Sequence, residues 1–251
     1  MQRNLRKKLP VVNQVAVINK SINLRNMKKL FFLFTTLSVI AIVITSFKPI
    51  TAPRIYPELE AYFKSVETKA FSKDRMDVLR NIQYNVEISG YDFEDWNLIF
   101  FCSENTFRSQ ASQVFAQTLC YERKHKKINV FSAGQTSGEI DPRLIAYLTK
   151  IGYRIAKSEK EEKTMYEVKF SDRADPIILF SKTISDQSLP SKDITSVVVC
   201  DTEKEPVCKE LKTPSTPLSL VFPKVLTTDD AGKVEATLKS IAAEMLYVTQ
   251  K

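Results

Sequence analysis

The 251-residue sequence contains a single histidine, His125, and only four cysteines, none of them in a Cys-x2-Cys pair. Structural zinc sites are built from such clustered Cys and His ligands, so a metal site of this kind is not expected. His125 lies among the Lys and Arg side chains of residues 123–127, where we expect it to be solvated.

Acidic residues are missing from residues 1–52, which hold nine of the 37 Lys and Arg. All 29 Asp and Glu therefore lie in the rest of the chain, where they nearly balance the remaining basic residues. The net charge of +8 thus belongs to the leader. Nucleic acid is not an expected partner, because binding to the phosphate backbone requires a basic patch on the folded part.

Charged residues are also absent from residues 30–47, an apolar run preceded by Lys28 and Lys29. This arrangement predicts an N-terminal hydrophobic helix that serves as a signal peptide or an uncleaved signal anchor. Basic residues are dense before the run and sparse after it, which keeps the N-terminus in the cytoplasm. We therefore expect residues 53–251 to be exported. They would be periplasmic, or anchored in the inner membrane with the folded domain outside the cytoplasm. Cleavage after Ala52 and a start at Met27 are both left open.

Residues 53–95 carry apolar side chains at helical spacing and predict a helical extension. In residues 96–251, short apolar runs alternate with amphipathic stretches. Continuous apolar runs are typical of strands buried on both faces of a parallel sheet. We expect strands at 97–101, 128–132, 176–180 and 195–199, and helices around 111–119, 144–151 and 234–245. The pattern predicts an α/β domain with an open four-stranded parallel sheet and helices on both faces.

The connections between these elements are charged or rich in proline. KSEKEEK, residues 157–163, predicts a solvated loop. Residues 185–193 and 204–228 carry much of the proline and predict long surface loops.

The first expected strand ends at Cys102, and Arg108 and Ser109 follow after five intervening residues. Ligands bind at the carboxyl ends of the strands in such sheets, and the next helix begins near Arg108. The loop between strand and helix would surround a bound anion. It consists of Ser103, Glu104, Asn105, Thr106 and Phe107.

The residue types of this loop suit phosphate chemistry. Its N–H groups and the helix N-terminus favour an anion and a thiolate. Cys102 can attack phosphorus or arsenic, and Arg108 can bind two oxygens of the anion. Ser109 can hydrogen-bond the thiolate, and Asn105 tolerates a left-handed turn. The simpler alternative is a buried core cysteine with an incidental arginine nearby.

Residues 97–123, together with Ser132-Ala133-Gly134, resemble the low-molecular-weight protein tyrosine phosphatase superfamily, which includes the thioredoxin-coupled arsenate reductases. The resemblance spans about residues 96–251 and implies a phosphotyrosine phosphatase I-like fold. It implies that Cys102 is the nucleophile and Arg108 the phosphate ligand, with no cofactor or metal. It also implies an Asp general acid before the last helix, a place held by Asp229 and Asp230. We favour Asp230; the alternative for both is a cap of that helix.

Two positions depart from the pattern of the phosphatases. Glu104 stands where they usually have Gly, and its carboxylate would repel a dianion unless it points away or pairs with a base. Phe107 replaces their second loop cysteine, which excludes a disulfide within the loop. Cys120, on the next helix, is expected in the core.

The resemblance leaves three functions open. The first is hydrolysis of a phosphorylated protein or small phosphoester through a cysteinyl-phosphate intermediate. The second is arsenate reduction, in which Cys200 and Cys208 would relay oxidation to a thioredoxin-like reductant; export argues against it. The third is an inactive exported module that binds phosphate or a phosphopeptide. Cys200 and Cys208 could equally form a structural disulfide.

Overall fold

The computed structural model describes residues 54–66, 70–88, 95–125, 127–160 and 163–250. The basic leader and its apolar run at 30–47 lie outside these ranges, so the hydrophobic helix predicted there stays a prediction. Among the helices that are described, none combines the length and apolar character needed to span a bilayer.

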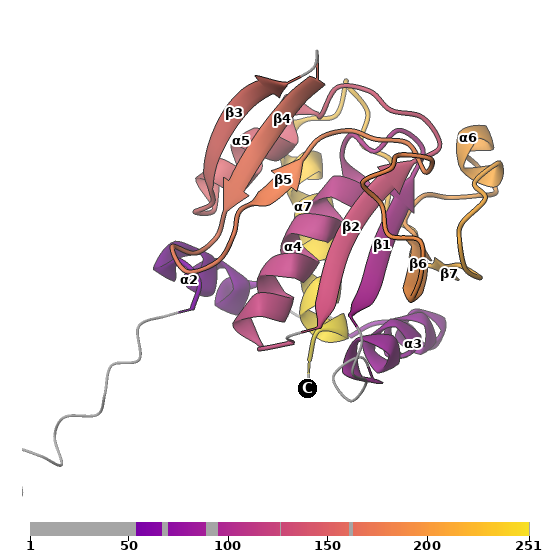
Figure 1. The fold of residues 1–251 in the computed structure, drawn as a ribbon, viewed down its shortest axis with the longest axis horizontal. Coiled ribbons are helices and arrows are strands. Elements are labelled where there is room, and N and C mark those ends of the chain that lie inside the picture. Colours follow the sequence, from indigo (N-terminus) through magenta and orange to yellow (C-terminus); the bar gives the residue numbers. More distant parts are fainter. Residues whose placement is uncertain (1–53, 67–69, 89–94, 126, 161–162, 251) are drawn as a thin grey trace, which may run out of the picture. The chain divides into compact units, whose positions relative to one another are not determined.

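A four-stranded parallel sheet forms the centre of the fold (Figure 1). Its strands are β1 (Trp96–Cys102), β2 (Ile128–Gly134), β6 (Ile194–Val198) and β7 (Leu218–Ser219), in the order β2-β1-β6-β7. Every residue of β1 after Trp96 is buried, as expected for a continuous apolar run in the middle of a sheet. The predicted α/β class with a four-stranded parallel sheet is confirmed.

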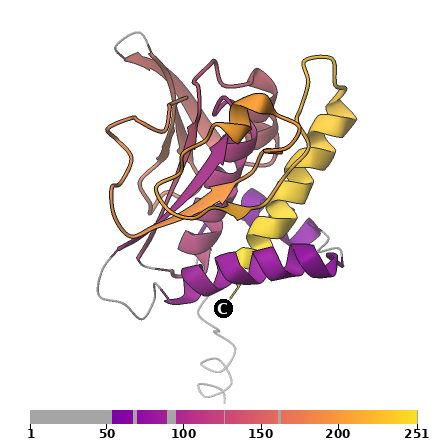
Figure 2. The same cartoon turned by 90° about the vertical axis from the view of Figure 1, so that its right-hand side faces the viewer.

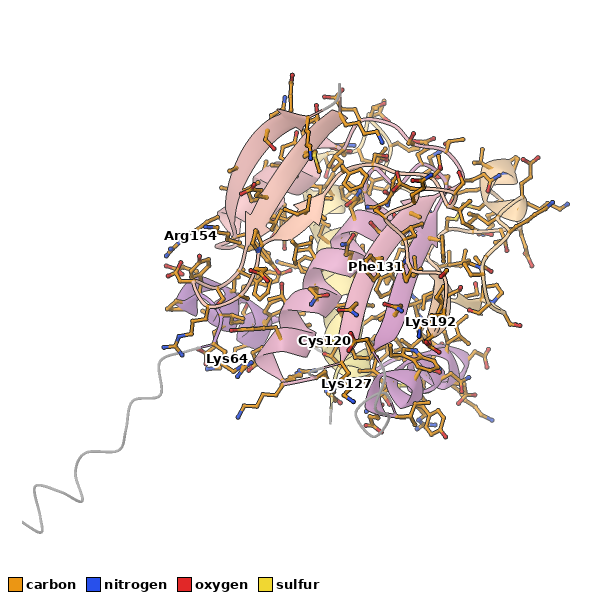
Figure 3. All side chains as sticks on the ribbon, in the orientation of Figure 1. Lys64, Cys120, Lys127, Phe131, Arg154 and Lys192 are labelled. Carbon is orange, nitrogen blue, oxygen red and sulfur yellow. A yellow bond between two sulfur atoms is a disulfide. The ribbon has the colours of Figure 1, made fainter. Side chains whose placement is uncertain are left out.

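Helix α4 (Arg108–Glu122) packs against this sheet, and helix α7 (Ala231–Val248) packs against α4. The contacts of α4 with the sheet are to β1 and β2. Cys120 of α4, labelled in Figure 3, is fully buried, and burial raises the pKa of its thiol to about 12. It is a core residue, as the sequence predicted.

The helical extension consists of α2 (Pro57–Ser65) and α3 (Lys73–Ile88). Its buried side chains, which include Leu59, Phe63, Leu79 and Ile82, join the same hydrophobic core as the strands. In Figure 2, α3 runs across the C-terminal end of α7. The extension is therefore packed against the α/β body.

A second, antiparallel sheet corrects two predictions. Its strands are β3 (Arg154–Lys160), β4 (Lys163–Lys169) and β5 (Ile177–Leu179). The expected loop at 157–163 thus belongs largely to strands; β3 is almost entirely exposed, so no apolar periodicity marks it. The apolar run at 176–180 predicts a strand of the parallel sheet, but β5 pairs with β4 in the antiparallel sheet. The fourth place in the parallel sheet is taken by the two-residue strand β7.

Two shorter helices complete the described fold. Helix α5 (Pro142–Lys150) is capped by Asp141, whose side chain accepts a hydrogen bond from Arg143 N. Helix α6 (Pro206–Lys209) and strand β7 lie within residues 204–228, where the sequence predicts one long loop. That expectation was wrong in these two places.

Candidate active site

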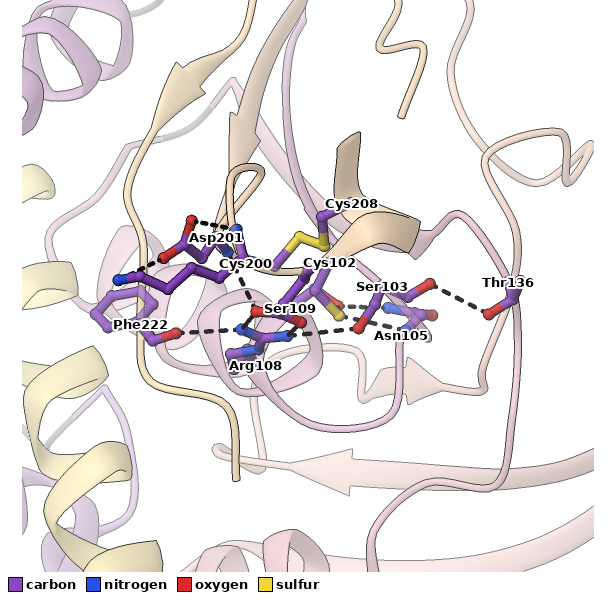
Figure 4. Close-up of a disulfide and its surroundings, with 12 residues drawn as sticks. Cys102, Ser103, Asn105, Arg108, Ser109, Thr136, Cys200, Asp201, Cys208 and Phe222 are labelled. Atoms are coloured by element: carbon purple, nitrogen blue, oxygen red, sulfur yellow. Dashed lines mark hydrogen bonds and ion pairs between the residues drawn. A yellow bond between two sulfur atoms is a disulfide. The ribbon is translucent and has the colours of Figure 1, made fainter. Parts of the chain in front are cut away.

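The loop from Cys102 to Arg108 joins the C-terminal end of β1 to the start of α4 (Figure 4). Asn105, at its centre, has a φ of 52°, the left-handed conformation that its residue type was expected to tolerate. The Asn105 amide oxygen accepts hydrogen bonds from Lys182 N at 2.9 Å and from Gln110 Nε2 at 3.0 Å. One buried asparagine thus ties the loop to α4 and to the segment after β5.

Cys102 is 3% exposed and has two polar neighbours. Its Sγ lies 2.9 Å from Ser109 Oγ and accepts a hydrogen bond from Asn105 N at 3.3 Å. Asn105 Nδ2 donates to Ser109 Oγ at 2.8 Å, which leaves the hydroxyl proton of Ser109 free to point toward sulfur. Both neighbours can therefore donate to a thiolate at Cys102.

The loop also presents donors for an anion. The N–H groups of residues 103, 104, 106 and 107 donate to none of the residues that the structure describes. They precede the N-terminus of α4, where helix geometry adds partial positive charge. Unpaired N–H groups beside a helix N-terminus form the kind of cradle that binds phosphate.

Gly134, at the end of β2, lets this loop approach the sheet. A Cβ placed there would lie 2.5 Å from Thr136 O and 2.7 Å from Asn105 N. Both are backbone atoms, so a side chain would push the loop away from its position. Thr136 N donates to Ser103 O at 2.9 Å, a second direct contact between the cysteine loop and the segment after β2.

Arg108 is 4% exposed, and its guanidinium pairs with a carboxylate that the sequence analysis missed. Arg108 Nη1 and Nη2 each donate to one carboxylate oxygen of Glu205, both at 2.6 Å. Nη1 also donates to Phe222 O at 3.2 Å, and Nη2 to Ser103 Oγ at 3.4 Å (Figure 4). No local signal could have identified Glu205, because it lies far from Arg108 in the sequence.

The electrostatics of this pair keep Glu205 charged. Burial alone raises the pKa of Glu205, but the hydrogen bonds and positive charge of Arg108 outweigh burial, so the net pKa lies below its ordinary value. Glu104, the carboxylate expected to disturb the site, has an exposed side chain, and its carbonyl accepts from Ser181 Oγ at 3.0 Å. The acidic group on the arginine is thus Glu205 and not Glu104.

The other loop positions support the cradle through their backbone. Ser103 and Phe107 are buried, and Thr106 is half-buried. Thr106 O accepts a hydrogen bond from Asp141 N at 3.1 Å, which connects the loop to the start of α5.

Asp229 and Asp230 both act at the start of α7. Asp230 Oδ1 accepts from Lys233 N at 2.8 Å and caps the helix. Asp229 accepts from Lys233 Nζ and from Leu226 N, both at 2.7 Å, and these bonds lower its pKa. Within the described ranges, no hydrogen bond or ion pair joins either carboxylate to Cys102 or Arg108. Their role as general acid stays a prediction.

Cys200 and Cys208 form a disulfide, with their Cα atoms 6.3 Å apart. Cys200 lies two residues after β6, the strand beside β1, and the intervening Val199 N donates to Phe101 O at 2.8 Å. The disulfide therefore lies close to the end of β1 that carries Cys102, as Figure 4 shows. Within the described ranges, no cluster of three or more His, Cys, Asp or Glu could hold a metal ion.

The solved structures to which this chain is similar include a phosphatase and arsenate reductases. A form of YwlE arginine phosphatase with a phosphorylated active-site serine is 14% identical, covers 61% of this chain and 93% of its own, and has a TM-score of 0.38. A YwlE mutant from Bacillus subtilis is 14% identical, with coverages of 62% and 97% and a TM-score of 0.39. A thioredoxin-dependent arsenate reductase from Corynebacterium glutamicum is 18% identical, with coverages of 84% and 93% and a TM-score of 0.35.

A search of curated proteins gave no match. Residues 97–198 match the family described as low molecular weight phosphotyrosine protein phosphatase. The matched segment contains Cys102, the whole anion cradle and Arg108. The predicted resemblance to the low-molecular-weight protein tyrosine phosphatase superfamily is therefore confirmed over residues 97–198.

Proposed function

We propose that this chain hydrolyses phosphate monoesters through a cysteinyl-phosphate intermediate on Cys102. The observation that carries the proposal is the environment of the Cys102 sulfur. Ser109 Oγ lies 2.9 Å from it and Asn105 N 3.3 Å, at the entrance to a helix that begins with Arg108. A stabilised thiolate at the base of an anion cradle is what in-line attack on phosphorus requires.

In the first step the Cys102 thiolate attacks phosphorus, a P–S bond forms, and the bond from phosphorus to the ester oxygen breaks. An acid, Asp230 or Asp229, protonates the leaving oxygen. The guanidinium of Arg108 and the loop N–H groups stabilise the charge on the equatorial oxygens. In the second step the same Asp takes a proton from water, the water oxygen attacks phosphorus, and the P–S bond breaks. The hydroxyl of Ser109 then donates to the departing thiolate.

The substrate class in this proposal is a phosphorylated protein or a small phosphoester. The test is hydrolysis of p-nitrophenyl phosphate by the full chain in the presence of a dithiol. Cys102→Ser should abolish turnover, whereas Cys120→Ala, which changes a buried cysteine of α4, should retain it. Equal activity in Cys102→Ser and the parent protein would refute the mechanism.

Arsenate reduction is the second candidate, and the Cys200–Cys208 disulfide beside the end of β1 favours it. In that reaction Cys102 binds arsenate and Cys200 attacks its sulfur, which releases arsenite and leaves a Cys102–Cys200 disulfide. Cys208 then displaces Cys102, and a thioredoxin-like dithiol reduces the Cys200–Cys208 disulfide that remains. Arsenate-dependent consumption of a dithiol that is lost in Cys208→Ser would support this function.

We also propose that residues 53–251 act outside the cytoplasm, because the apolar run at 30–47 follows a basic segment. Fractionation of cells that express the tagged chain tests this.

If neither activity is found while phosphate still protects the protein against thermal unfolding, the chain is an inactive module that binds phosphate or a phosphopeptide.

A further inference from the structure

The phosphate-binding arginine of the cradle is already occupied from within the chain. Both terminal nitrogens of Arg108 donate to Glu205 at 2.6 Å, and the side chains of the pair are only 4% and 13% exposed. A carboxylate offers the guanidinium two oxygens in one plane, as two oxygens of a phosphate do. Glu205 thus takes the contacts that a substrate would use.

An incoming phosphate dianion meets two obstacles at this position. The carboxylate of Glu205 cancels the charge of Arg108, and its own negative charge repels the dianion. The remaining partners of the guanidinium, Phe222 O and Ser103 Oγ, leave little room for a second acceptor on the same two nitrogens. Productive binding therefore requires Glu205 to move away from Arg108.

The disulfide closes the loop that carries Glu205. Glu205 lies between Cys200 and Cys208, which are 0% and 1% exposed. The loop that they close is braced internally, since Glu205 N donates to Asp201 O at 2.8 Å and Asp201 N donates to Glu205 Oε1 at 3.2 Å. Cys208 N donates to Glu205 O at 2.9 Å. The disulfide fastens this braced loop to the end of β6, one strand from Cys102.

We propose that Glu205 is an internal occupant of the phosphate site and that the Cys200–Cys208 disulfide holds it there. In this arrangement the oxidised protein has a closed site, and a dithiol reductant opens it. One thiolate of the reductant attacks a sulfur of the disulfide, and its second thiol resolves the mixed disulfide. Two electrons and two protons pass to Cys200 and Cys208, and the reductant leaves as its own disulfide. The freed loop can then carry Glu205 away from Arg108.

This inference relies on the proposed function only for the identity of the anion, so it can be tested by binding alone. The probe is inorganic phosphate, titrated calorimetrically into the full chain carrying Cys102→Ser. That substitution prevents turnover and removes the thiol of the cradle. Cys120 is already a free thiol, so the Cys200–Cys208 pair is the disulfide among the described residues that the dithiol can reduce. The state of the pair is read by mass after alkylation.

The reduced protein should bind phosphate at least about 10-fold more tightly than the oxidised protein. Once Glu205 has moved away, Arg108 can donate two charge-assisted hydrogen bonds to phosphate. Glu205→Gln, which keeps the shape but removes the charge, should bind tightly even when oxidised. Glu203→Gln is the matched control: it removes a negative charge from an exposed position of the same loop and should retain the redox dependence.

The contrary outcomes are distinct. Equal phosphate affinity in the oxidised and reduced proteins would overturn the gate and leave the hydrolase proposal intact. Weaker binding in Glu205→Gln would show that Glu205 positions Arg108 and does not block it, which also overturns the gate. Absence of phosphate binding in every form, reduced Glu205→Gln included, would overturn the cradle itself and with it the proposed function.

Discussion

The hydroxyl of Ser109 lies 2.9 Å from the sulfur of Cys102 and accepts a hydrogen bond from the Asn105 side chain at 2.8 Å. The amide of Asn105 fixes the direction of the hydroxyl, because an oxygen that accepts from nitrogen keeps its own proton for another acceptor. Cys102 is the acceptor within reach. Ser109 is therefore placed to stabilise the thiolate both before attack and when it leaves.

Ser109→Ala should lower kcat for p-nitrophenyl phosphate by about 10- to 100-fold, the value of one hydrogen bond to a charged group. The loss should appear mainly in kcat, because the hydroxyl serves the sulfur and not the phosphate. Steady-state kinetics under a dithiol measure this. Ser112→Ala is the control, since Ser112 is a buried serine of the same helix whose hydroxyl donates to Arg108 O. An unchanged kcat in Ser109→Ala would contradict the assignment.

Gly134→Ala should displace the loop that forms the anion cradle, because Gly134 lies where the end of β2 contacts this loop. The added Cβ would meet Thr136 O at 2.5 Å and Asn105 N at 2.7 Å, neither of which can rotate away. We expect a loss of about 1–3 kcal/mol in the free energy of unfolding, as for other overpacked sites. Weaker phosphate binding should accompany it.

Gly138→Ala provides the comparison for this substitution. Its Cβ would meet only Thr106 Cγ2, at 3.1 Å, and a side-chain methyl group can shift. Urea unfolding and phosphate titration should therefore show a smaller effect than for Gly134→Ala. If the two variants behave alike, the close approach at Gly134 does not shape the loop.

The strand, the cysteine loop and the following helix could be predicted from sequence because their signals are local. The apolar run of β1, the spacing from Cys102 to Arg108 and the apolar stripe of α4 all lie within residues 96–122. Chain continuity alone places them in the right order. The same holds for Asp230, whose position directly before α7 identified it as a possible cap.

The features that sequence reasoning missed depend on contacts between distant segments. Glu205 lies 97 residues after Arg108, in the loop that the Cys200–Cys208 disulfide closes after β6, the strand beside β1. Strand β3 has an exposed, charged pattern that resembles a loop, and only pairing with β4 makes it a strand. Strand β7 has two residues, too few for any periodicity.

Substitutions at Asn105 should separate backbone strain from lost hydrogen bonds. Asn105→Gly and Asn105→Ala both remove the side chain that contacts Ser109, Gln110 and Lys182. Both replacements must adopt a φ of 52°, and this costs about 1–2 kcal/mol for alanine but not for glycine. Asn105→Ala should therefore be the less stable of the two in urea unfolding. The reverse order would show that the loop rearranges once the side chain is gone.

Glu244 of α7 should give the protein a distinct dependence of stability on pH. It pairs with Arg75 of α3 at 2.7 Å, yet burial raises its pKa to about 7, and Arg75 offsets this only in part. In the unfolded chain a glutamate titrates near pH 4.3. Between these two pH values Glu244 is ionised in the unfolded chain but still protonated in the folded protein. The free energy of unfolding therefore falls as the pH rises from about 4.3 to 7.

Glu244→Gln should remove this contribution, because glutamine does not titrate and resembles the protonated acid. The stability of Glu244→Gln relative to the parent protein should rise by about 2–3 kcal/mol between pH 4.3 and pH 7 and then level off. Urea unfolding of both proteins at several pH values measures the difference. Glu235→Gln on the same helix should give the opposite slope at lower pH, since Lys239 and Lys150 hold the pKa of Glu235 at about 2. A pH-independent difference for Glu244→Gln would mean that Arg75 keeps Glu244 ionised in the folded protein.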